Sequence, residues 1–252
     1  MLWYKSWLDT RWRFLIALLV LAVMACGVVA SYNFSRSLLP ALADRPIDTS
    51  TTAGRLLKEA LRIEQTYRGW VWVQWFRQNL LQTGTLFAIV LGSGGVISTS
   101  KGGLFTLSLP ASRADWMMTR AATGLGECLV LATVPSVALS VFSPIIGQHY
   151  SVVDVLVHGV CFFVAAALFY SLAFLLSTVF HDVWRPLGIA IGIACLIALL
   201  EGLLDVRGIF HLMSGYEYFA SGSIPWVGLT SSAALSAALL YGAAANVAHK
   251  DF

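Results

Sequence analysis

The sequence predicts an all-α integral membrane protein, and two observations support this prediction. Of the 252 residues, 58% are hydrophobic and 12% are charged, whereas a soluble domain carries about 25% charged residues. So few charges cannot cover a water-facing surface, so much of the surface must face lipid. The apolar residues also form runs near the length of about 20 residues that crosses a bilayer. Phe14–Tyr32 and Val155–Phe180 contain no Asp, Glu, Lys or Arg.

Six transmembrane helices are predicted within a single transmembrane domain that comprises residues 1–252. Their approximate bounds are 14–32, 79–97, 117–143, 153–180, 187–204 and 225–247. Pro135 lies inside the third run and predicts a bend there, because proline removes a backbone donor. The nine tryptophans lie outside the centres of the runs or at their ends, as expected for an aromatic belt at the membrane surface.

Three segments outside these runs predict elements at the membrane surface. Residues 1–13 alternate aromatic and charged side chains, which is typical of a short interfacial helix. In the polar stretch 33–78, apolar residues recur at helical spacing and predict an amphipathic extracytoplasmic helix before the second span, with an ion pair between Glu64 and Arg68. The apolar positions are Leu56, Ala60, Ile63, Tyr67 and Trp70. The connection 205–224 predicts a short re-entrant or interfacial element.

The distribution of Lys and Arg predicts the orientation. With the N-terminus in the cytoplasm, the short segments on that side contain eight Lys or Arg residues, and the short segments outside contain one. The seven other basic residues lie in the long stretch 33–78, and a long loop is translocated with less regard to charge. We therefore expect both termini to be cytoplasmic. The same topology explains the net charge of +3, so no nucleic-acid partner is expected.

No motif in the sequence predicts catalysis, a metal or a cofactor. A phosphate-binding loop ends in Gly-Lys-Ser/Thr, whereas Ser100–Gly103 has another order and spacing. The Leu91–Gly95 segment resembles a nucleophile elbow only in composition, and a membrane hydrolase would also need a histidine such as His158 on a facing helix. The four cysteines lie in apolar runs without metal-ligand spacing. We therefore expect a chain that is not an enzyme.

The connection 98–116 between the second and third predicted spans is unusually apolar for a loop. Four large apolar residues precede Pro110 and are followed by Ser112 and Arg113. These four are Leu104, Phe105, Leu107 and Leu109. The pattern predicts a short surface helix, which either lies in the lipid headgroups or docks onto a partner protein.

The same connection resembles the membrane subunit of ABC-2-type ATP-binding-cassette transporters. In that family a glycine, a few apolar residues and a Leu-Ser-Leu-Pro-x-Ser-Arg string lie between helices 2 and 3, and this chain has Gly103 and Leu107–Arg113. Pro225–Trp226 and the tail Lys250–Phe252 are also similar to the family. Family members usually carry acidic residues just before the glycine, where this chain has Ser98–Lys101.

The resemblance implies a six-helix permease subunit with an ABC-2 (type V exporter-like) fold in a bacterial cytoplasmic membrane. Two such subunits, identical or different, would form the translocation path within the lipid and work with separate ATPase subunits that bind ATP and Mg. Residues 98–113 would be the coupling segment on the ATPase. Its candidate contact residues are Lys101, Gly103, Leu107, Leu109, Pro110, Ser112 and Arg113.

Glu127 is the candidate polar site inside the membrane. It lies ten residues into the predicted span 117–143, about 15 Å deep at 1.5 Å per residue. A carboxylate there costs a few kcal/mol or more unless it is paired, so we expect it to face the bundle interior or a water-filled cavity. It either contacts substrate or a proton, or forms a structural hydrogen bond to Thr or Ser on a neighbouring helix.

Two alternatives to a transporter subunit remain open. An ABC-type membrane scaffold or assembly factor would bind an ATPase without classical transport, because fold does not decide use. An ion-coupled secondary carrier would use Glu127 and would need no ATPase. Near the outer end of the fifth span, Glu201, Asp205 and Arg207 predict an interfacial charge group.

Overall fold

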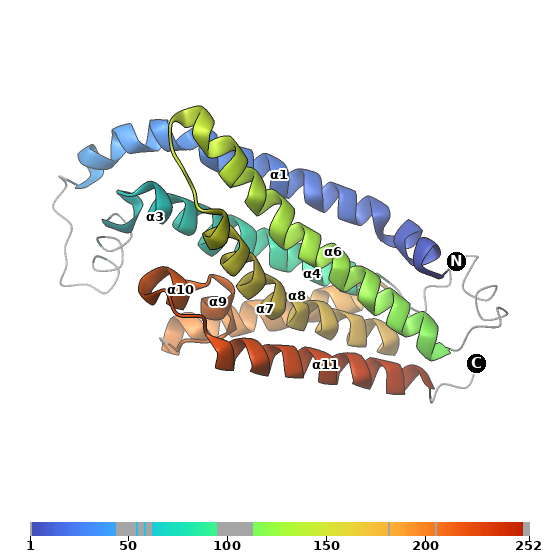
Figure 1. Ribbon diagram of the computed structural model, residues 1–252. Helices are drawn as coiled ribbons and strands as arrows, with labels where there is room; N and C mark the ends of the chain where they lie inside the picture. Colours follow the sequence, from blue (N-terminus) through green and yellow to red (C-terminus); the bar gives the residue numbers. More distant parts are fainter. Residues whose placement is uncertain are drawn as a thin grey trace.

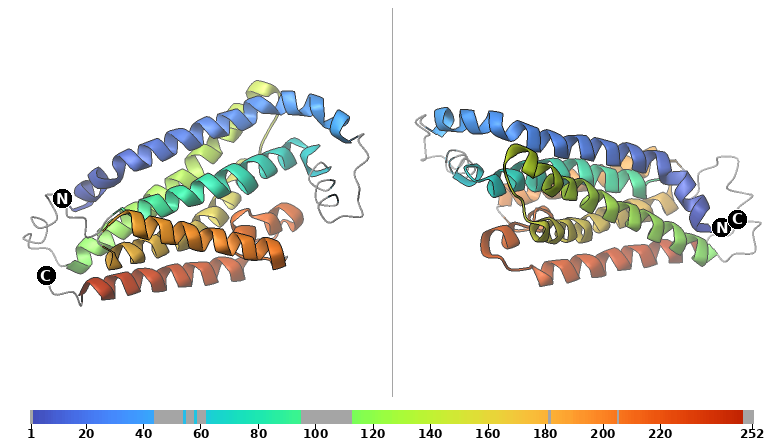
Figure 2. Two further views of the ribbon diagram at one scale, coloured as in Figure 1. Left: turned by 180° about the vertical axis from the view of Figure 1, so that it is seen from behind. Right: turned by 45° about the horizontal axis from the view of Figure 1, so that its top comes forward.

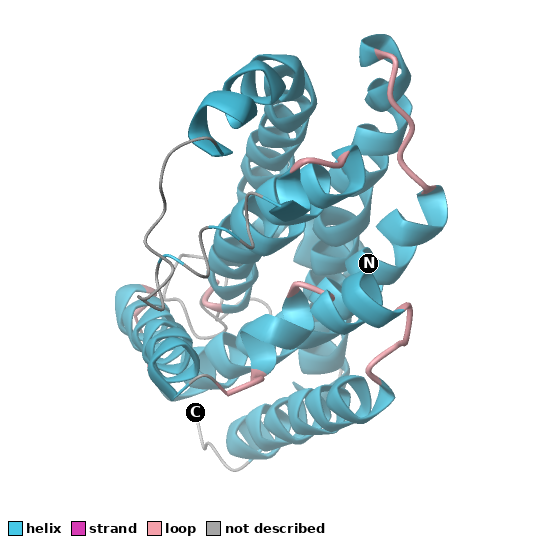
Figure 3. Cartoon of the chain, turned by 90° about the vertical axis from the view of Figure 1, so that its left-hand side faces the viewer, coloured by secondary structure: helices cyan, strands magenta, loops and turns pink. Residues whose placement is uncertain are grey.

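The computed structural model describes residues 2–43, 54, 58, 62–94, 113–180, 182–204 and 206–248, and these residues form helices without a strand (Figure 3). In chain order the elements are α1 (Leu2–Ala43), α3 (Tyr67–Val71), η1 (Trp72–Gly84), α4 (Thr85–Gly92), α6 (Arg113–Phe142), η2 (Ser143–Ile146), α7 (Val152–Val179), α8 (Trp184–Leu204), α9 (Ile209–Met213), α10 (Tyr216–Ser221) and α11 (Trp226–Ala248).

Five helices in the described part of the chain are long and apolar enough to cross a membrane. Their apolar segments are Leu2–Ser37, Asp115–Ile146, Val152–Val179, Trp184–Leu204 and Trp226–Ala248. The chain is therefore a multi-pass membrane protein. The first, third, fourth, fifth and sixth predicted runs overlap these helices, and the main differences are the longer first and third helices.

The second predicted run is part of a longer helical path. α3, η1 and α4 follow one another without a gap from Tyr67 to Gly92. This path therefore begins well before residue 79, where the sequence places the span, and residues 95–97 lie outside the described part. Half of its residues belong to η1, a π-helix of 13 residues, whereas π-helices in proteins are mostly single turns and often occur at functional sites.

α7 is the central helix of the bundle and packs against α4, α6, α8, α9 and α11. More than half of its apolar stretch, 56%, is buried inside the bundle, against 11% for α8. Its contact face alternates small and aromatic residues, among them Ala165, Phe169 and Ala173, each fully buried. Small residues let helices approach closely, and in a membrane such close packing drives helix association.

Successive helical passes run in alternate directions along the bundle, as Figures 1 and 2 show. The start of α1, the end of α11, the C-terminal end of α4 and the start of α6 therefore lie together at one end (Figure 1), which we call the terminal end. α3, η2, α9 and α10 lie at the other end, which we call the distal end. The connection between α4 and α6 thus begins and ends beside both termini.

The predicted separate interfacial helix over residues 1–13 is wrong. Residues 2–13 form the first turns of α1, which continues without a break for 42 residues, or about 63 Å at 1.5 Å per residue. This length is roughly twice the hydrocarbon thickness of about 30 Å. One side of these turns packs into the bundle, where Ser6 and Thr10 are buried, while Trp3, Tyr4 and Trp12 remain exposed.

The aromatic-belt interpretation is wrong for the tryptophans of α3 and η1. Trp70, Trp72 and Trp75 are buried, and all three indole nitrogens donate hydrogen bonds across the bundle. Trp70 Nε1 donates to the Val28 carbonyl on α1 at 3.3 Å. Trp72 Nε1 donates to the Ser214 carbonyl and Trp75 Nε1 to Ser136 Oγ, both at 2.9 Å. A buried indole needs such a partner, so these side chains hold helices together.

The predicted amphipathic helix lies mostly outside the described residues, including Leu56 and Ala60. Its described end breaks at residues 65–66, where Thr66 Oγ1 caps a new helix by accepting from the Gly69 amide at 3.1 Å. Tyr67 and Trp70 therefore belong to α3 and do not continue the helix that contains Ile63.

The predicted ion pair between Glu64 and Arg68 is also wrong. Glu64 Oε1 accepts from Gln74 Nε2 at 3.1 Å, while Arg68 pairs with Asp154 on α7 at 2.8 Å. The break before α3 removes the helical spacing that would have joined the two side chains. Tyr218 on α10 donates to the same Asp154 at 3.1 Å, so this carboxylate connects α3, α7 and α10 at the distal end.

Candidate functional site

The predicted coupling segment lies almost wholly outside the described residues. Its candidate contact residues Lys101, Gly103, Leu107, Leu109, Pro110 and Ser112 are all in the undescribed stretch 95–112, and Arg113 is the first residue of α6. The structure does show where this connection is anchored. Gly94 precedes it and Arg113 follows it, both at the terminal end (Figure 1).

Glu127 lies on α6 inside the bundle, as the sequence predicts, with 5% of its surface exposed. Its Oε1 accepts a hydrogen bond of 2.5 Å from Thr10 Oγ1 on α1. Its Oε2 is buried and has no hydrogen-bond partner among the described residues. The carboxylate thus joins α6 to α1 through a threonine, one of the two arrangements that the sequence leaves open.

Arg120, two turns before Glu127 on α6, is also buried. Its Nη2 donates to the Gly94 carbonyl, and its Nη1 lies 3.8 Å from Asp9 Oδ2 on α1. A Cβ atom at position 94 would lie 2.6 Å from Nη1 of Arg13 and 3.2 Å from Nη2 of Arg120. Only glycine fits between the two guanidinium groups without displacing them.

We call these residues the terminal polar cluster: Asp9, Thr10, Arg13, Gly94, Arg120 and Glu127. The cluster holds two carboxylates and two guanidinium groups, so its formal charges balance. Arg120 and Glu127 are buried, whereas Asp9 is exposed. It also joins three elements, because its members come from α1, the end of α4 and α6. Gly94, the last described residue before the connection, therefore binds Arg120 of α6 and lies against Arg13 of α1.

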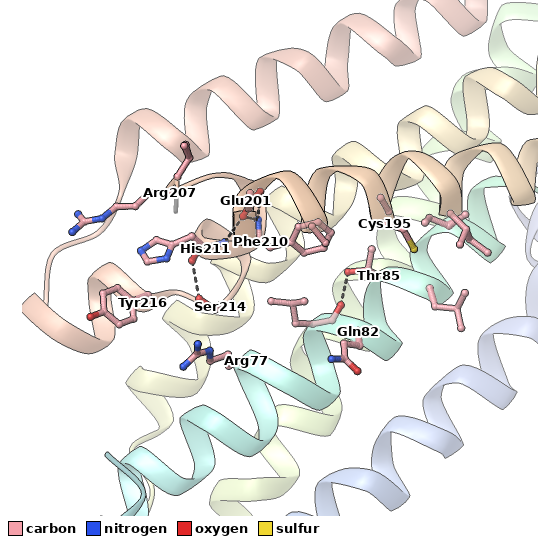
Figure 4. Close-up of a pocket in the computed structure, with 18 of the residues that line it drawn as sticks. Arg77, Gln82, Thr85, Cys195, Glu201, Arg207, Phe210, His211, Ser214 and Tyr216 are labelled. Atoms are coloured by element: carbon pink, nitrogen blue, oxygen red, sulfur yellow. Dashed lines mark hydrogen bonds between the residues drawn. The ribbon is translucent and has the colours of Figure 1, made fainter. Parts of the chain in front are cut away.

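At the distal end a cavity of about 950 Å³ lies between η1 and α4 on one side and α8, α9 and the start of α10 on the other (Figure 4). Its volume is within the range of about 300–1,000 Å³ that is common for ligand sites. The inner part is apolar and includes Ile89, Ile191 and Ala194. Leu86, Cys195 and Ala198 also line it and are exposed, so the cavity opens laterally between α4 and α8.

The π-helical geometry of η1 places three cavity residues on one face. Trp72, Arg77 and Gln82 all line the cavity and are five residues apart. A π-helix bonds residue i to i+5, so residues five apart lie nearly above one another. On an α-helix the same residues would diverge by about 140°, at 100° per residue. Analysis of 3.6-residue periodicity therefore could not have found this face.

Glu201 shapes the cavity from α8. Its carboxylate accepts from the backbone amides of Phe210 and His211 at 3.2–3.4 Å and so caps the N-terminus of α9. Gly208 permits this contact, since a Cβ there would lie 2.3 Å from Glu201 Oε1. Two of the three residues of the predicted interfacial charge group, Glu201 and Arg207, therefore line the cavity. The third, Asp205, lies outside the described residues.

The distal mouth of the cavity is polar and carries positive charge. Arg77, Arg207, His211 and Tyr216 gather there (Figure 4). The pKa of His211 is lowered mainly by burial and then by the positive charge of Arg207. Its Nε2 is buried without a partner among the described residues. A second hollow of about 720 Å³ on the other side of α9 shares Arg207, His211 and Tyr216.

The structure does not bring together the residues that a membrane hydrolase would need. His158 is fully buried near the start of α7, between Phe76 and Tyr218 at the distal end. Ser93 follows α4 at the terminal end and donates to the Val90 carbonyl. In the described part of the chain no three His, Cys, Asp or Glu side chains gather as metal ligands.

No family model, curated protein or solved structure matches this chain. Its function is therefore inferred from its own residues and from their arrangement at the two ends of the bundle.

Proposed function

We propose that the chain is a membrane-spanning permease subunit of an ABC-2-type transporter, an exporter that is driven by a separate ATPase subunit. The observation that carries the proposal is the string from Leu107 to Arg113, preceded by Gly103, in the connection between α4 and α6. This string resembles the family's coupling segment. Its anchoring residues Gly94 and Arg113 lie beside both chain termini, which supports its assignment to the side of the membrane where an ATPase would bind.

The sequence has no nucleotide-binding motif, which agrees with a transporter that is driven by ATP hydrolysis on a partner subunit in contact with it. ATP and Mg would be held by the partner, and coupling would require an element whose position differs between two states. The terminal polar cluster provides a route for such a change. Arg120 binds the Gly94 carbonyl and Glu127 binds Thr10, so movement of the connection would reach α1 and α6 directly.

In this proposal the path from Tyr67 to Gly92 is a sixth transmembrane passage, and the terminal end faces the cytoplasm of a bacterium. Six passages agree with the common location of both termini (Figure 2). They also agree with the bias of Lys and Arg toward the short segments at this end. A second permease subunit would complete the translocation path.

The proposal is tested by recovery of the ATPase from membranes in mild detergent with the tagged chain as bait. Leu107→Asp/Leu109→Asp should abolish recovery, because an apolar side chain contributes about 1.5–3 kcal/mol when a partner buries it and a carboxylate would be buried unpaired. Ile145→Asp/Ile224→Asp is the matched control, since both residues are exposed and lie at the distal end. Equal recovery with both double variants, at equal membrane insertion, would reject docking and favour a headgroup-lying helix.

An ion-coupled carrier is the second candidate, because Glu127 Oε2 is buried without a partner among the described residues. Such a carrier would move substrate without any ATPase in the purified membrane fraction. An ABC-type scaffold or assembly factor would instead bind the ATPase but show no substrate-stimulated hydrolysis of ATP. Reconstitution of the chain with and without the recovered ATPase separates these three functions.

A further inference from the structure

The distal cavity combines two features that no structural role of its residues requires. Its inner wall, formed by α4 and α8, is apolar, while its mouth contains two guanidinium groups from different elements, Arg77 on η1 and Arg207 before α9. Arg77 at the mouth and Ile89 in the inner part are twelve residues apart on one continuous helical path. The cavity is therefore long as well as amphipathic, a shape that suits a molecule with a charged head and an apolar tail.

The two guanidinium groups at the mouth of the cavity are not held in ion pairs among the described residues. Glu201 is the carboxylate that lines the cavity among the described residues, and its oxygens already accept from the amides of Phe210 and His211. Glu217 lines the second hollow, on the other side of α9. Neither Arg77 nor Arg207 forms an ion pair with a described carboxylate. Arg77 lies over the ring of Trp72, with 5.7 Å from its guanidinium carbon to the ring centroid, which fixes the side chain and leaves its donors for a ligand.

We propose that this cavity binds an amphiphile with a phosphate-ester headgroup, held by Arg77 and Arg207 at the distal mouth, with its apolar tail between α4 and α8. Arginine is well suited to phosphate because its planar fork donates two parallel hydrogen bonds. A phosphate presents its oxygens in several directions and can accept from both guanidinium groups, whereas a planar carboxylate has two oxygens. His211 Nε2, which is buried at the same mouth, is a further polar group that faces the headgroup.

The lateral opening agrees with a ligand that is dissolved in the membrane. Leu86, Cys195 and Ala198 are exposed at residues that belong to the apolar passages of α4 and α8, so the tail can enter sideways from the bilayer. If the chain is a permease, the cavity is a candidate site for its substrate, and that reading rests on the proposed function. Binding itself does not, because it requires no ATPase.

Native mass spectrometry of the purified chain in a neutral detergent tests the proposal. Lysophosphatidylglycerol, which has an anionic phosphodiester head and one tail, should bind at least tenfold more tightly than lysophosphatidylcholine, which has the same tail and a zwitterionic head. Arg77→Gln/Arg207→Gln should remove this preference. Arg36→Gln removes one exposed positive charge near the distal end of α1, outside the cavity, and should leave the preference intact.

The tail has its own control. Ala198→Phe places a ring in the lateral opening between α4 and α8, where the tail would enter, and should reduce binding of lysophosphatidylglycerol at least tenfold. Ala237→Phe, on the exposed face of α11, should leave binding unchanged. Equal binding of the two lysolipids, or equal loss in Arg36→Gln and the double variant, would overturn the proposal. So would glycerophosphoglycerol, the head without a tail, if it displaced the lysolipid at the same concentration as lysophosphatidylglycerol itself.

Competition with diacyl phosphatidylglycerol identifies the source of the ligand. If the diacyl lipid displaces the lysolipid in a manner that depends on Arg77 and Arg207, the site takes bilayer phospholipid. If it does not, the site takes single-tailed amphiphiles. Loss of ATPase recovery and loss of lipid preference are separate measurements on separate ends of the bundle, so either proposal can fail alone.

Discussion

At the residue scale, Glu127 is the carboxylate on which the packing of α1 against α6 most depends. One oxygen accepts from Thr10, and the charge lies near Arg120, whose guanidinium group binds Gly94 and approaches Asp9. A buried carboxylate without such partners would be strongly unfavourable. The depth of Glu127 along its helix predicts that it is buried, but Thr10 could not be chosen as its partner, because residues 1–13 read as a separate surface helix.

Glu127→Leu should lower the free energy of unfolding in detergent by about 1–3 kcal/mol, because Thr10 loses its acceptor and Arg120 loses a nearby countercharge. Glu127→Gln keeps an acceptor and should cost less. Thr10→Val combined with Glu127→Leu should cost less than the sum of the two changes, because both remove the same hydrogen bond. Strict additivity in this thermal-unfolding cycle would show that the contact does not form.

His211 predicts how lipid binding depends on pH. Burial and the charge of Arg207 hold its pKa below the ordinary value, which is about 6.5. An anionic headgroup beside it favours the charged imidazole and raises that pKa, so binding takes up a proton. The affinity for lysophosphatidylglycerol should therefore rise as the pH falls from 8 to 5.5, while its phosphodiester stays singly charged.

The charged groups that act on His211 are Arg207, Glu217, Glu201 and Arg77, in order of their effect on its pKa. A variant at His211 itself therefore identifies the group that takes up the proton. His211→Gln should flatten the pH dependence while retaining the arginine-dependent preference. An unchanged slope in His211→Gln, measured by the same mass-spectrometric titration, would assign the proton to another group.

At the element scale, the π-helical geometry of η1 could not be predicted from the sequence. Composition predicts a helix over its residues, but a period of 3.6 cannot place Trp72, Arg77 and Gln82 on one face, because that face exists only with the wider turns of a π-helix. The same limit explains the error over the tryptophans of α3 and η1. An indole at a helix end fits a membrane surface equally well, and only tertiary packing shows that Trp72 reaches the Ser214 carbonyl.

Trp72→Phe should lower the free energy of unfolding by about 1–3 kcal/mol, because the buried Ser214 carbonyl loses its donor. The phenyl ring can keep the stacking on Phe219, whose centroid lies 4.4 Å away. Trp226→Phe is the matched control, since Trp226 is 66% exposed, and surface changes usually stay within about 0.5 kcal/mol. Equal effects of the two substitutions on thermal unfolding would contradict a structural role for the indole donor.

At the scale of the whole molecule, alternation of the helices brings the end of α4 and the start of α6 beside the start of α1 and the end of α11, and it places the end of α1 at the distal end. The apolar runs alone predict most of the long helices, because lipid demands a continuous apolar helix about 20 residues long. They cannot predict the distal cavity, because its lining residues come from separate elements that lie between Ile63 and Tyr216 in the sequence. Its formation depends on the loose packing of α8 and on the cap that Glu201 provides to α9.

The two ends should lie on opposite sides of the membrane. In a variant without its four native cysteines, Ser50→Cys should react with an impermeant maleimide from the outside and Ser100→Cys from the cytoplasm. The reason is the bias of basic residues toward the short segments of the terminal end. Labelling of both positions from the same side of oriented membrane vesicles would contradict the topology.

The central claim is that an ATPase docks on the terminal end through residues 98–113. Photo-crosslinking tests it most directly, with benzoylphenylalanine in place of Leu107 and, as the matched position, in place of Ile145 at the distal end. We expect a crosslink from position 107 to a nucleotide-binding subunit and none from position 145. Crosslinks from position 107 to lipid alone, with the chain inserted at normal levels, would contradict it.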